Sequence, residues 1–141
     1  MGSYESLIDA KNRYAVPAKF RDELDGKCVL TRGLDNCLLI YPMKTWEAQQ
    51  AKLATLPSSD KQVRAFLRYI YANAVECEID KQGRMVLSEK FREIASIDKE
   101  VVSIGMLDRI EIWAKEVYDD AENGGQLSAE DLEKFSESYR V

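Results

Sequence analysis

Short apolar runs, separated by turn-forming residues, occur along the whole chain and predict a mixture of strands and helices. Four of these runs are rich in β-branched and large apolar residues and predict β-strands. They span residues 28–31, 38–41, 101–104 and 110–113. Glycine-containing segments at 32–36 and 105–108 predict the turns that join the strands in two pairs.

Two helices are predicted between these strand pairs. The first covers residues 45–56 and ends at Pro57, and the second follows the capping residues at 58–60. Its apolar residues recur at helical spacing and are expected to pack against a core or a neighbouring subunit: Val63, Phe66, Leu67, Ile70 and Tyr71. The basic residues on the other face are expected to be solvated: Lys61, Arg64 and Arg68.

A last short helix is predicted near the C-terminus. The chain is expected to break at residues 123–125, and Ser128 and Asp131 then offer a capping box. Leu132 and Phe135 give this helix little apolar area, so we expect it to dock weakly or to fray.

The chain contains an internal repeat, in which residues 4–21 align with residues 75–92 at a constant offset of 71. The identical pairs are Glu5/Glu76, Ile8/Ile79, Asp9/Asp80, Arg13/Arg84, Lys19/Lys90, Phe20/Phe91 and Arg21/Arg92, and Gly33/Gly105 follows after a one-residue gap. The repeat predicts a duplicated, pseudo-twofold core. Its parts are subdomains at 4–46 and 75–118, a helical connector at 47–74 and an acidic tail at 119–141.

Each copy carries an Asp-x-x-x-Arg loop between two short predicted strands. Asp9 and Asp80 are expected to open a type I turn of a three-residue hairpin connection. Asn12 and Gly83 fall at the left-handed position, which these residue types tolerate. A short helix should follow each copy, starting near Pro17 in the first and capped by Ser88 in the second.

Composition excludes several classes of protein. The sequence has no histidine, so Ser/His/Asp and Cys/His catalytic sites and His-ligated zinc are excluded. Its three cysteines are widely spaced and are expected to be buried thiols in a reducing cytoplasm, with neither a disulfide framework nor a metal site. We expect no membrane span, no cofactor and no small-molecule substrate.

The formal net charge of −5 does not exclude a nucleic-acid partner, because the acidic excess is terminal. Residues 114–141 contain 3 basic and 8 acidic side chains, whereas residues 1–113 contain 17 of each. A solvated acidic tail therefore accounts for the whole excess.

The repeated loop is the candidate functional feature. One interpretation is structural, with each Asp accepting backbone N–H bonds and each Arg forming a weak surface ion pair. Duplication favours a second interpretation, in which two guanidinium groups on one surface contact phosphate or guanine. Further cations nearby would add sequence-independent attraction to phosphate: Lys11, Lys19, Arg21, Lys81, Lys90 and Arg92.

Six segments together resemble the MraZ family of bacterial transcriptional regulators. They lie at residues 9–13, 16–21, 31–38, 73–76, 80–84 and 110–113, and the resemblance extends over residues 1–118. It implies an α+β fold: a duplicated swapped-hairpin β-barrel of two SpoVT-AbrB-type (AbrB-like) units, with short helices and a helical insert between the repeats. Two departures are Ser88, where the family has proline, and the lack of Phe-x-Gly before Tyr4.

The resemblance also implies a function. It implies a homo-oligomeric ring of eight or more subunits, in the cytoplasm at the nucleoid, that binds double-stranded DNA. The sites implied are short G-rich direct repeats in the promoter of the division and cell-wall gene cluster, which includes the protein's own gene. The residues expected to contact DNA are Arg13 and Arg84, with Lys11 and Lys81 beside them, and the residues expected to orient the loops are Asp9, Asp80, Asn12 and Gly83.

Two other functions remain open from the sequence. The ring could be a protein-interaction scaffold without sequence-specific DNA binding, with the same arginines forming ion pairs between subunits. A small hydrolase using Asp9 or Asp80 is the more remote alternative, because an arginine four residues from each carboxyl group would lower its pKa. We therefore expect a protein that is not an enzyme.

Overall fold

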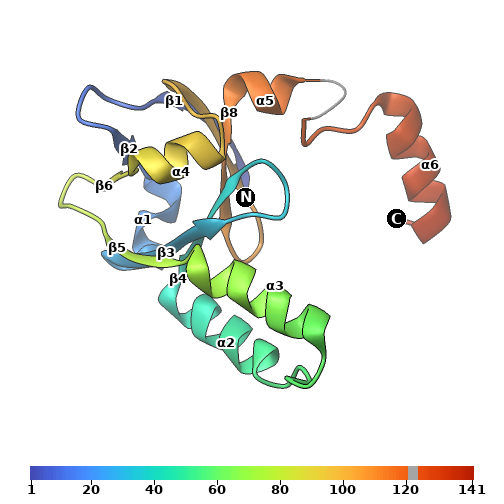
Figure 1. The fold of residues 1–141 in the computed structure, drawn as a ribbon. Coiled ribbons are helices and arrows are strands. Elements are labelled where there is room, and N and C mark those ends of the chain that lie inside the picture. The colour runs from blue at the N-terminus through green and yellow to red at the C-terminus, as the bar shows by residue number, and fades with distance from the viewer. Residues whose placement is uncertain (121–123) are drawn as a thin grey trace.

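The structure is a computed structural model that describes residues 1–120 and 124–141. These residues form an α+β fold of two antiparallel sheets with short helices around them (Figure 1). The strands of the larger sheet are β1 (Gly2–Leu7), β3 (Lys27–Arg32), β4 (Leu38–Pro42), β5 (Val75–Glu78), β7 (Glu100–Gly105) and β8 (Ile110–Ala114). Their order is β1-β7-β8-β4-β3-β5, and β2 (Arg13–Ala15) pairs with β6 (Arg84–Val86) in a separate two-stranded ribbon. All four strands predicted from the apolar runs are therefore confirmed.

The helices are α1 (Ala18–Leu24), α2 (Met43–Leu53), α3 (Lys61–Ala72), α4 (Glu89–Ile94), α5 (Lys115–Asp119) and α6 (Ala129–Tyr139). Three predicted caps are confirmed, because the side chains of Asp60, Ser88 and Ser128 each accept a bond from a backbone N–H of the first turn. Ser88 thus starts α4 without the proline that the family resemblance led us to expect. The five-residue helix α5 was not predicted.

Strands from the two halves of the chain pair with one another. Strand β1 pairs along its whole length with β7, from Gly2 opposite Gly105 to Leu7 opposite Glu100. Strand β5, from the second half, pairs with β3 from the first half. The β2–β6 ribbon also joins the halves, so every strand that flanks a repeated loop has its partner in the other half.

Two expectations about the strands are wrong. The strands on either side of each Asp-x-x-x-Arg loop do not form a hairpin ladder with each other, since they pair in different sheets. The sheet is also not a closed barrel: β1 and β5 are its two edges. The physical reason is that the chain leaves the large sheet after β1 and after β5 and enters a three-residue strand of the ribbon, which is too short to bridge the edges.

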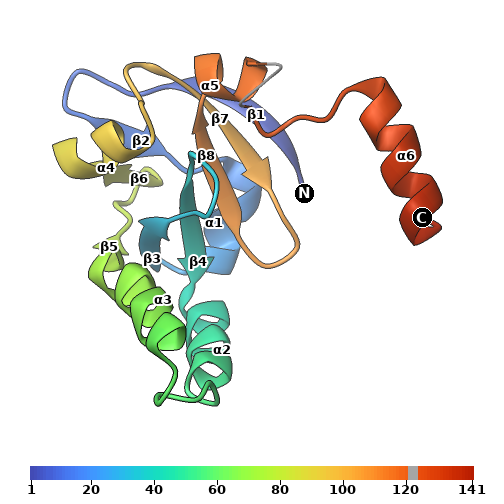
Figure 2. The same ribbon diagram turned by 45° about the vertical axis from the view of Figure 1, so that its right-hand side comes forward.

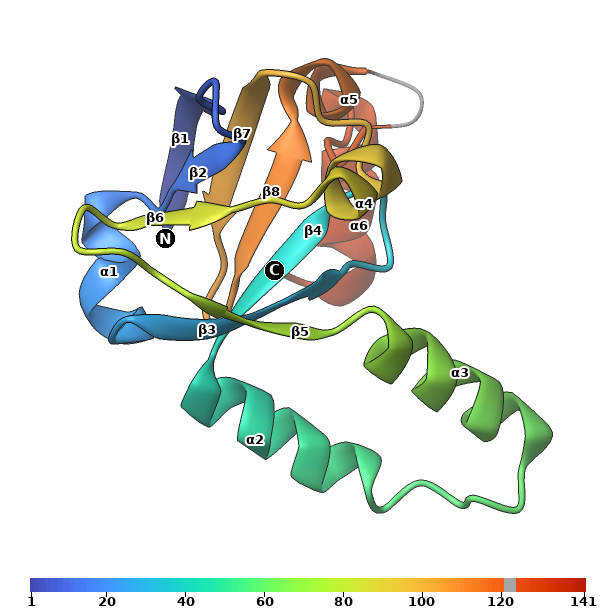
Figure 3. The ribbon, with the colours of Figure 1, turned by 60° about the vertical axis from the view of Figure 1, so that its left-hand side comes forward.

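The core lies between the larger sheet and the β2–β6 ribbon, which crosses one face of that sheet near α1 and α4 (Figure 3). Its largest fully buried side chains include Tyr14, Leu30, Leu38, Ile40 and Met85. Alternation along the ribbon explains this arrangement, because Tyr14 and Met85 point inward and their strand neighbours point outward.

The helices outside this core are less well covered. Helices α2 and α3 form a hairpin that extends from the ends of β4 and β5 (Figure 2). No residue of α3 is buried, so its predicted apolar stripe is only partly covered within one chain. Helix α6 stands apart from the sheets, with every residue exposed except the half-buried Ser136 (Figure 1). Of the predicted break at residues 123–125, Asn123 lies outside the described residues.

The cysteines are free thiols, with Cys28 and Cys37 buried and Cys77 half-buried. Among the described residues, no helix is long and apolar enough to cross a membrane.

Candidate nucleic-acid interface

The first Asp-x-x-x-Arg loop is organised by one carboxylate. Oδ1 of Asp9 accepts bonds from the backbone N–H groups of Lys11 and Arg13, both at 2.9 Å. Oδ2 of Asp9 accepts a 2.7 Å bond from Nε of Arg13. The backbone N–H of Asn12 donates to the Asp9 carbonyl at 3.0 Å, and Asn12 has a φ of 60°. The predicted turn with a left-handed Asn12 is therefore confirmed.

The second loop has the same geometry. Oδ1 of Asp80 accepts from the backbone N–H groups of Gln82 and Arg84, both at 2.9 Å, and Oδ2 accepts from Nε of Arg84 at 3.1 Å. Gly83 donates its N–H to the Asp80 carbonyl at 2.9 Å and has a φ of 77°. The duplication in sequence is thus a duplication of hydrogen bonding.

These hydrogen bonds lower the pKa of each aspartate and orient the side chain of each arginine. The backbone N–H of Arg13, followed by the Arg13 side chain and the N–H of Lys11, holds the pKa of Asp9 below its ordinary value. The backbone N–H of Arg84 has the same effect on the pKa of Asp80. Each guanidinium is oriented through Nε alone, and its two Nη atoms make no hydrogen bond to any described residue.

The ribbon places the two arginines on one face. In the β2–β6 register, Arg13 lies opposite Val86 and Arg84 lies opposite Ala15, with the inward pair Tyr14 and Met85 between them. Side chains alternate along a strand, so Arg13 and Arg84 both point outward. They lie diagonally across the ribbon, and standard strand spacings put their Cα atoms about 8 Å apart.

The two carboxylates do not share a site. Asp9 and Asp80 precede antiparallel strands, so their loops lie at opposite ends of the ribbon, and each carboxylate is bonded to its own arginine. This arrangement gives no support to the hydrolase alternative. Among the described residues, no group of three or more metal-ligating side chains lies together.

The helices after the loops brace the ends of the ribbon. Arg21 of α1 donates from Nε to the carbonyl of Val16 at 2.9 Å, and Arg92 of α4 donates to the carbonyl of Leu87 at 3.2 Å. These are equivalent positions of the two repeats. Part of each guanidinium is therefore engaged in the fold.

Each of these arginines also lies against the loop of the other half. A Cβ added at Gly83 would overlap the side chain of Arg21. Arg92 lines a cavity together with Asp9 and Asn12 of the first loop. Each end of the ribbon thus brings one of these arginines to the loop of the other half: Arg21 to Gly83, and Arg92 to Asp9 and Asn12.

The predicted lysines are all exposed. Lys11 and Lys81 are exposed at the loop tips, and Lys90 is exposed on α4. Lys19 is also exposed on α1, where its Nζ donates to the carbonyl of Met1 at 3.2 Å. All of these side chains are accessible to a large partner.

Two outward residues between the arginines were not predicted as site residues. Ala15 and Val86 share the face of Arg13 and Arg84, and Val86 is 61% exposed. They could have been identified from the sequence. Strand residues alternate between two faces, so the residues next to the inward-facing Tyr14 and Met85 face outward. An exposed valine in a strand that carries an arginine two positions away is a candidate for apolar contact with a base methyl group.

Comparison with known proteins identifies the family of the chain. The family model described as "MraZ protein" matches residues 1–69 and again residues 70–137. A relative from Thermoanaerobacter sp. (strain X514), named "Transcriptional regulator MraZ", is 49% identical over 141 residues, which is 100% of this chain and 99% of the relative. Relatives with the same name from Caldicellulosiruptor saccharolyticus (100% of this chain, 99% of the relative) and Pediococcus pentosaceus (96% and 97%) are each 44% identical. The chain belongs to the MraZ family, as its resemblance in sequence indicated.

Proposed function

We propose that this protein is a sequence-specific DNA-binding transcriptional regulator that contacts DNA through the β2–β6 ribbon and its two loops. The observation that carries the proposal is the shared outward face of Arg13 and Arg84, whose Nη atoms are not used by any described residue. Family membership and the names of the relatives support the same function.

The chemistry of the surface suits DNA. A two-stranded ribbon fits the major groove, and an arginine oriented through Nε can offer its Nη atoms to O6 and N7 of a guanine. Lys11 and Lys81 lie beside the arginines, and Lys19 and Lys90 lie on the flanking helices, where they would attract phosphates regardless of sequence. Arg21 and Arg92 would contribute less, because each donates through Nε to a carbonyl of its own half.

The finer features of the proposal come from the family resemblance. They are the duplicated swapped-hairpin units at residues 4–46 and 75–118, a ring of eight or more subunits at the nucleoid, and G-rich direct repeats in the promoter of its own division and cell-wall cluster. The pairing of strands between the halves supports the exchange of hairpins. A ring would present many identical ribbons, so tandem DNA repeats could be bound tightly through modest individual contacts.

The test is a titration of the purified protein on DNA from immediately upstream of its own gene, with a scrambled duplex as competitor. Arg13→Ala and Arg84→Ala should each cost about 1–3 kcal/mol of binding free energy on the promoter DNA. Lys44→Ala, which removes an exposed cation from α2, is the matched control and should change little.

The oligomer of each variant is measured on a sizing column. The proposal requires that both arginine variants keep the mass of the unmodified protein while losing preference for the promoter. Loss of assembly in these variants, with DNA binding that lacks sequence preference, would instead support the scaffold function and reject the proposed contact residues.

A further inference from the structure

One exposed apolar side chain lies on the outer face of the β2–β6 ribbon. Val86 is 61% exposed, whereas Met85 and Leu87, on either side of it in the chain, are 2% and 0% exposed. These two buried neighbours anchor β6 in the core, so the alternation of the strand fixes the outward direction of Val86. Because its side chain is branched at Cβ, Val86 also loses little rotamer freedom when it makes a contact.

The ribbon holds Val86 beside Arg13. The two residues are directly opposite in the register, and the backbone N–H of Leu87 donates to the carbonyl of Asn12 at 2.9 Å. Directly opposed residues of an antiparallel pair have Cβ atoms about 4.5–5.5 Å apart. Since Nε of Arg13 is bonded to Asp9, Val86 is the apolar neighbour of an oriented guanidinium.

The other end of the ribbon has a smaller residue at the matching position. Ala15 lies opposite Arg84, is the equivalent of Val86 in the internal repeat, and is half-buried. Its side chain has no carbon beyond Cβ. The ribbon therefore combines an arginine with a long enough apolar side chain at its Arg13 end only.

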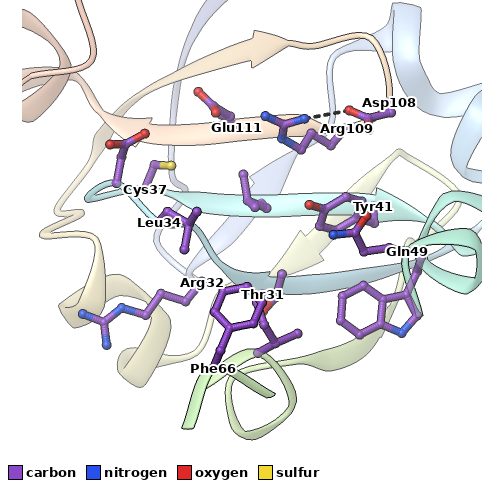
Figure 4. Close-up of a pocket in the computed structure, with 14 residues that line it drawn as sticks. Thr31, Arg32, Leu34, Cys37, Tyr41, Gln49, Phe66, Asp108, Arg109 and Glu111 are labelled. Atoms are coloured by element: carbon purple, nitrogen blue, oxygen red, sulfur yellow. Dashed lines mark hydrogen bonds and ion pairs between the residues drawn. The ribbon is translucent and has the colours of Figure 1, made fainter. Parts of the chain in front are cut away.

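The opposite side of the larger sheet is less suited to DNA. Leu39, Tyr41 and Glu111 alternate with core residues of β4 and β8, so they lie on the sheet face away from the ribbon. They line a cavity of about 310 Å³, where Arg109 donates to Asp108 at 2.7 Å (Figure 4). The lining has three carboxylates and two guanidinium groups, so this cavity does not attract phosphates. The ribbon face is the better surface for a base contact.

The major groove offers a partner to each member of the Arg13–Val86 pair. A guanine presents O6 and N7 to an arginine, and a thymine presents its C5 methyl group to an apolar side chain. Stacked base pairs are about 3.4 Å apart along the duplex. Two side chains that lie opposite each other in the ribbon would therefore reach base pairs one or two steps apart.

We propose that Val86 is a specificity-determining residue that contacts the C5 methyl group of a thymine, one or two base pairs from the guanine bound by Arg13. The inference rests on the proposed function, because it requires the ribbon to lie in the major groove. At the Arg84 end, Ala15 is too short for the same contact. The preference for a methyl group is therefore confined to the Arg13 end of the site.

The test removes the methyl group from the DNA and leaves the protein intact. Deoxyuridine replaces thymidine in the duplex from immediately upstream of the protein's own gene, which deletes the C5 methyl groups and keeps the base pairing. The unmodified protein should bind this duplex at least about fourfold more weakly than the thymidine duplex, the effect of losing one buried methylene-sized group.

Single replacements then locate the contact. The guanine bound by Arg13 is the one whose replacement by 7-deazaguanine, which lacks N7, weakens binding of the unmodified protein but not of Arg13→Ala. Thymidines are replaced by deoxyuridine one at a time. The replacement that weakens binding should lie within two base pairs of that guanine.

Val86→Ala removes the same contact from the protein. This variant should bind the thymidine duplex at least about fourfold more weakly than the unmodified protein does, and it should lose little further on the deoxyuridine duplex. Val75→Ala is the matched control, because Val75 is a 47% exposed valine on β5 of the larger sheet. It should keep the full effect of the deoxyuridine replacement.

Three outcomes would overturn the proposal. The unmodified protein could bind both duplexes equally, Val86→Ala could lose as much affinity on deoxyuridine replacement as the unmodified protein, or the sensitive thymidine could lie far from the guanine bound by Arg13. In each case the preference for promoter over scrambled DNA would remain, and the proposed function would stand. An unmodified protein without that preference would overturn the proposed function and this inference together.

Discussion

Tyr14 and Met85 lie directly opposite each other in the β2–β6 ribbon, and they are equivalent positions of the internal repeat, 71 residues apart. The register is therefore symmetric about this pair, with Arg13 opposite Val86 and Arg84 opposite Ala15. The symmetry gives the two arginines matching positions on the outer face. The buried pair beneath them fixes the ribbon on the core.

The Tyr14 hydroxyl bonds to the Ser103 Oγ at 2.6 Å and joins the ribbon to β7. Tyr14→Phe leaves the buried Ser103 hydroxyl without this partner and should lower the free energy of unfolding by about 1–3 kcal/mol in a urea titration. Ser103→Ala removes the other group, so the double variant should lose less than the sum of the two single losses. Strict additivity would show that the bond contributes nothing.

Arginine and lysine are not equivalent in the proposed base contact. Arg13→Lys with Arg84→Lys keeps the charge but loses the planar guanidinium. The promoter DNA should be bound at least about tenfold more weakly, while binding to scrambled DNA and its salt dependence stay nearly unchanged. Equal losses on both DNAs would mean that these arginines contact phosphates.

Both loop aspartates have a pKa below the ordinary value of 3.8. Their stabilising effect is complete above the unfolded-state pKa and is lost as pH falls through the folded-state pKa. In thermal melts below about pH 5, Asp9→Asn with Asp80→Asn should flatten the decline of the melting temperature with acidity. An unchanged decline would contradict a stabilising role for these carboxylates.

Gly83 combines a φ of 77° with the Arg21 side chain, which a Cβ would overlap. Gly26 has the same φ but has no atom within 4 Å of a built Cβ, so it is a matched control. Gly26→Ala should cost about 1 kcal/mol of unfolding free energy for the backbone alone. Gly83→Ala should cost more than Gly26→Ala in the same urea titration, and an equal or smaller cost would show that Arg21 moves away freely.

Burial raises the pKa of Cys28 and Cys37 to about 12, so both are thiols in the folded protein. Cys77 is half-buried and should react first with an aromatic disulfide reagent at neutral pH. Cys28 and Cys37 should react only as the protein unfolds. Three thiols reacting at one fast rate in the native protein would contradict this placement.

Local features of this fold could be predicted from the sequence because they depend on near neighbours. The Asp9 and Asp80 turns and the cap at Ser88 are set by residues within four positions along the chain. The pairing of β1 with β7 and of β5 with β3 could not be predicted in this way. A tight loop favours a local hairpin, and only packing of the whole core selects distant partners instead.

The geometry of the candidate site was predictable to a similar extent. The repeat pointed to Arg13 and Arg84, and hydrophobic alternation through Tyr14 and Met85 could have added Val86. The engagement of Arg21 with the Val16 carbonyl and its position against Gly83 depend on how the two halves pack. Spacing along one strand or one helix contains no information about that contact.

The two loop tips are alike in backbone geometry but differ in sequence. Between its aspartate and its arginine the first has Ala10, Lys11 and Asn12, and the second has Lys81, Gln82 and Gly83. Two separate identical chains would carry identical tips, whereas two halves joined in one chain can diverge. The two ends of the ribbon consequently differ in their side chains. In our proposal, the DNA sequence that one subunit reads therefore need not be a palindrome. A row of such subunits would then distinguish the two orientations of an operator along the genome.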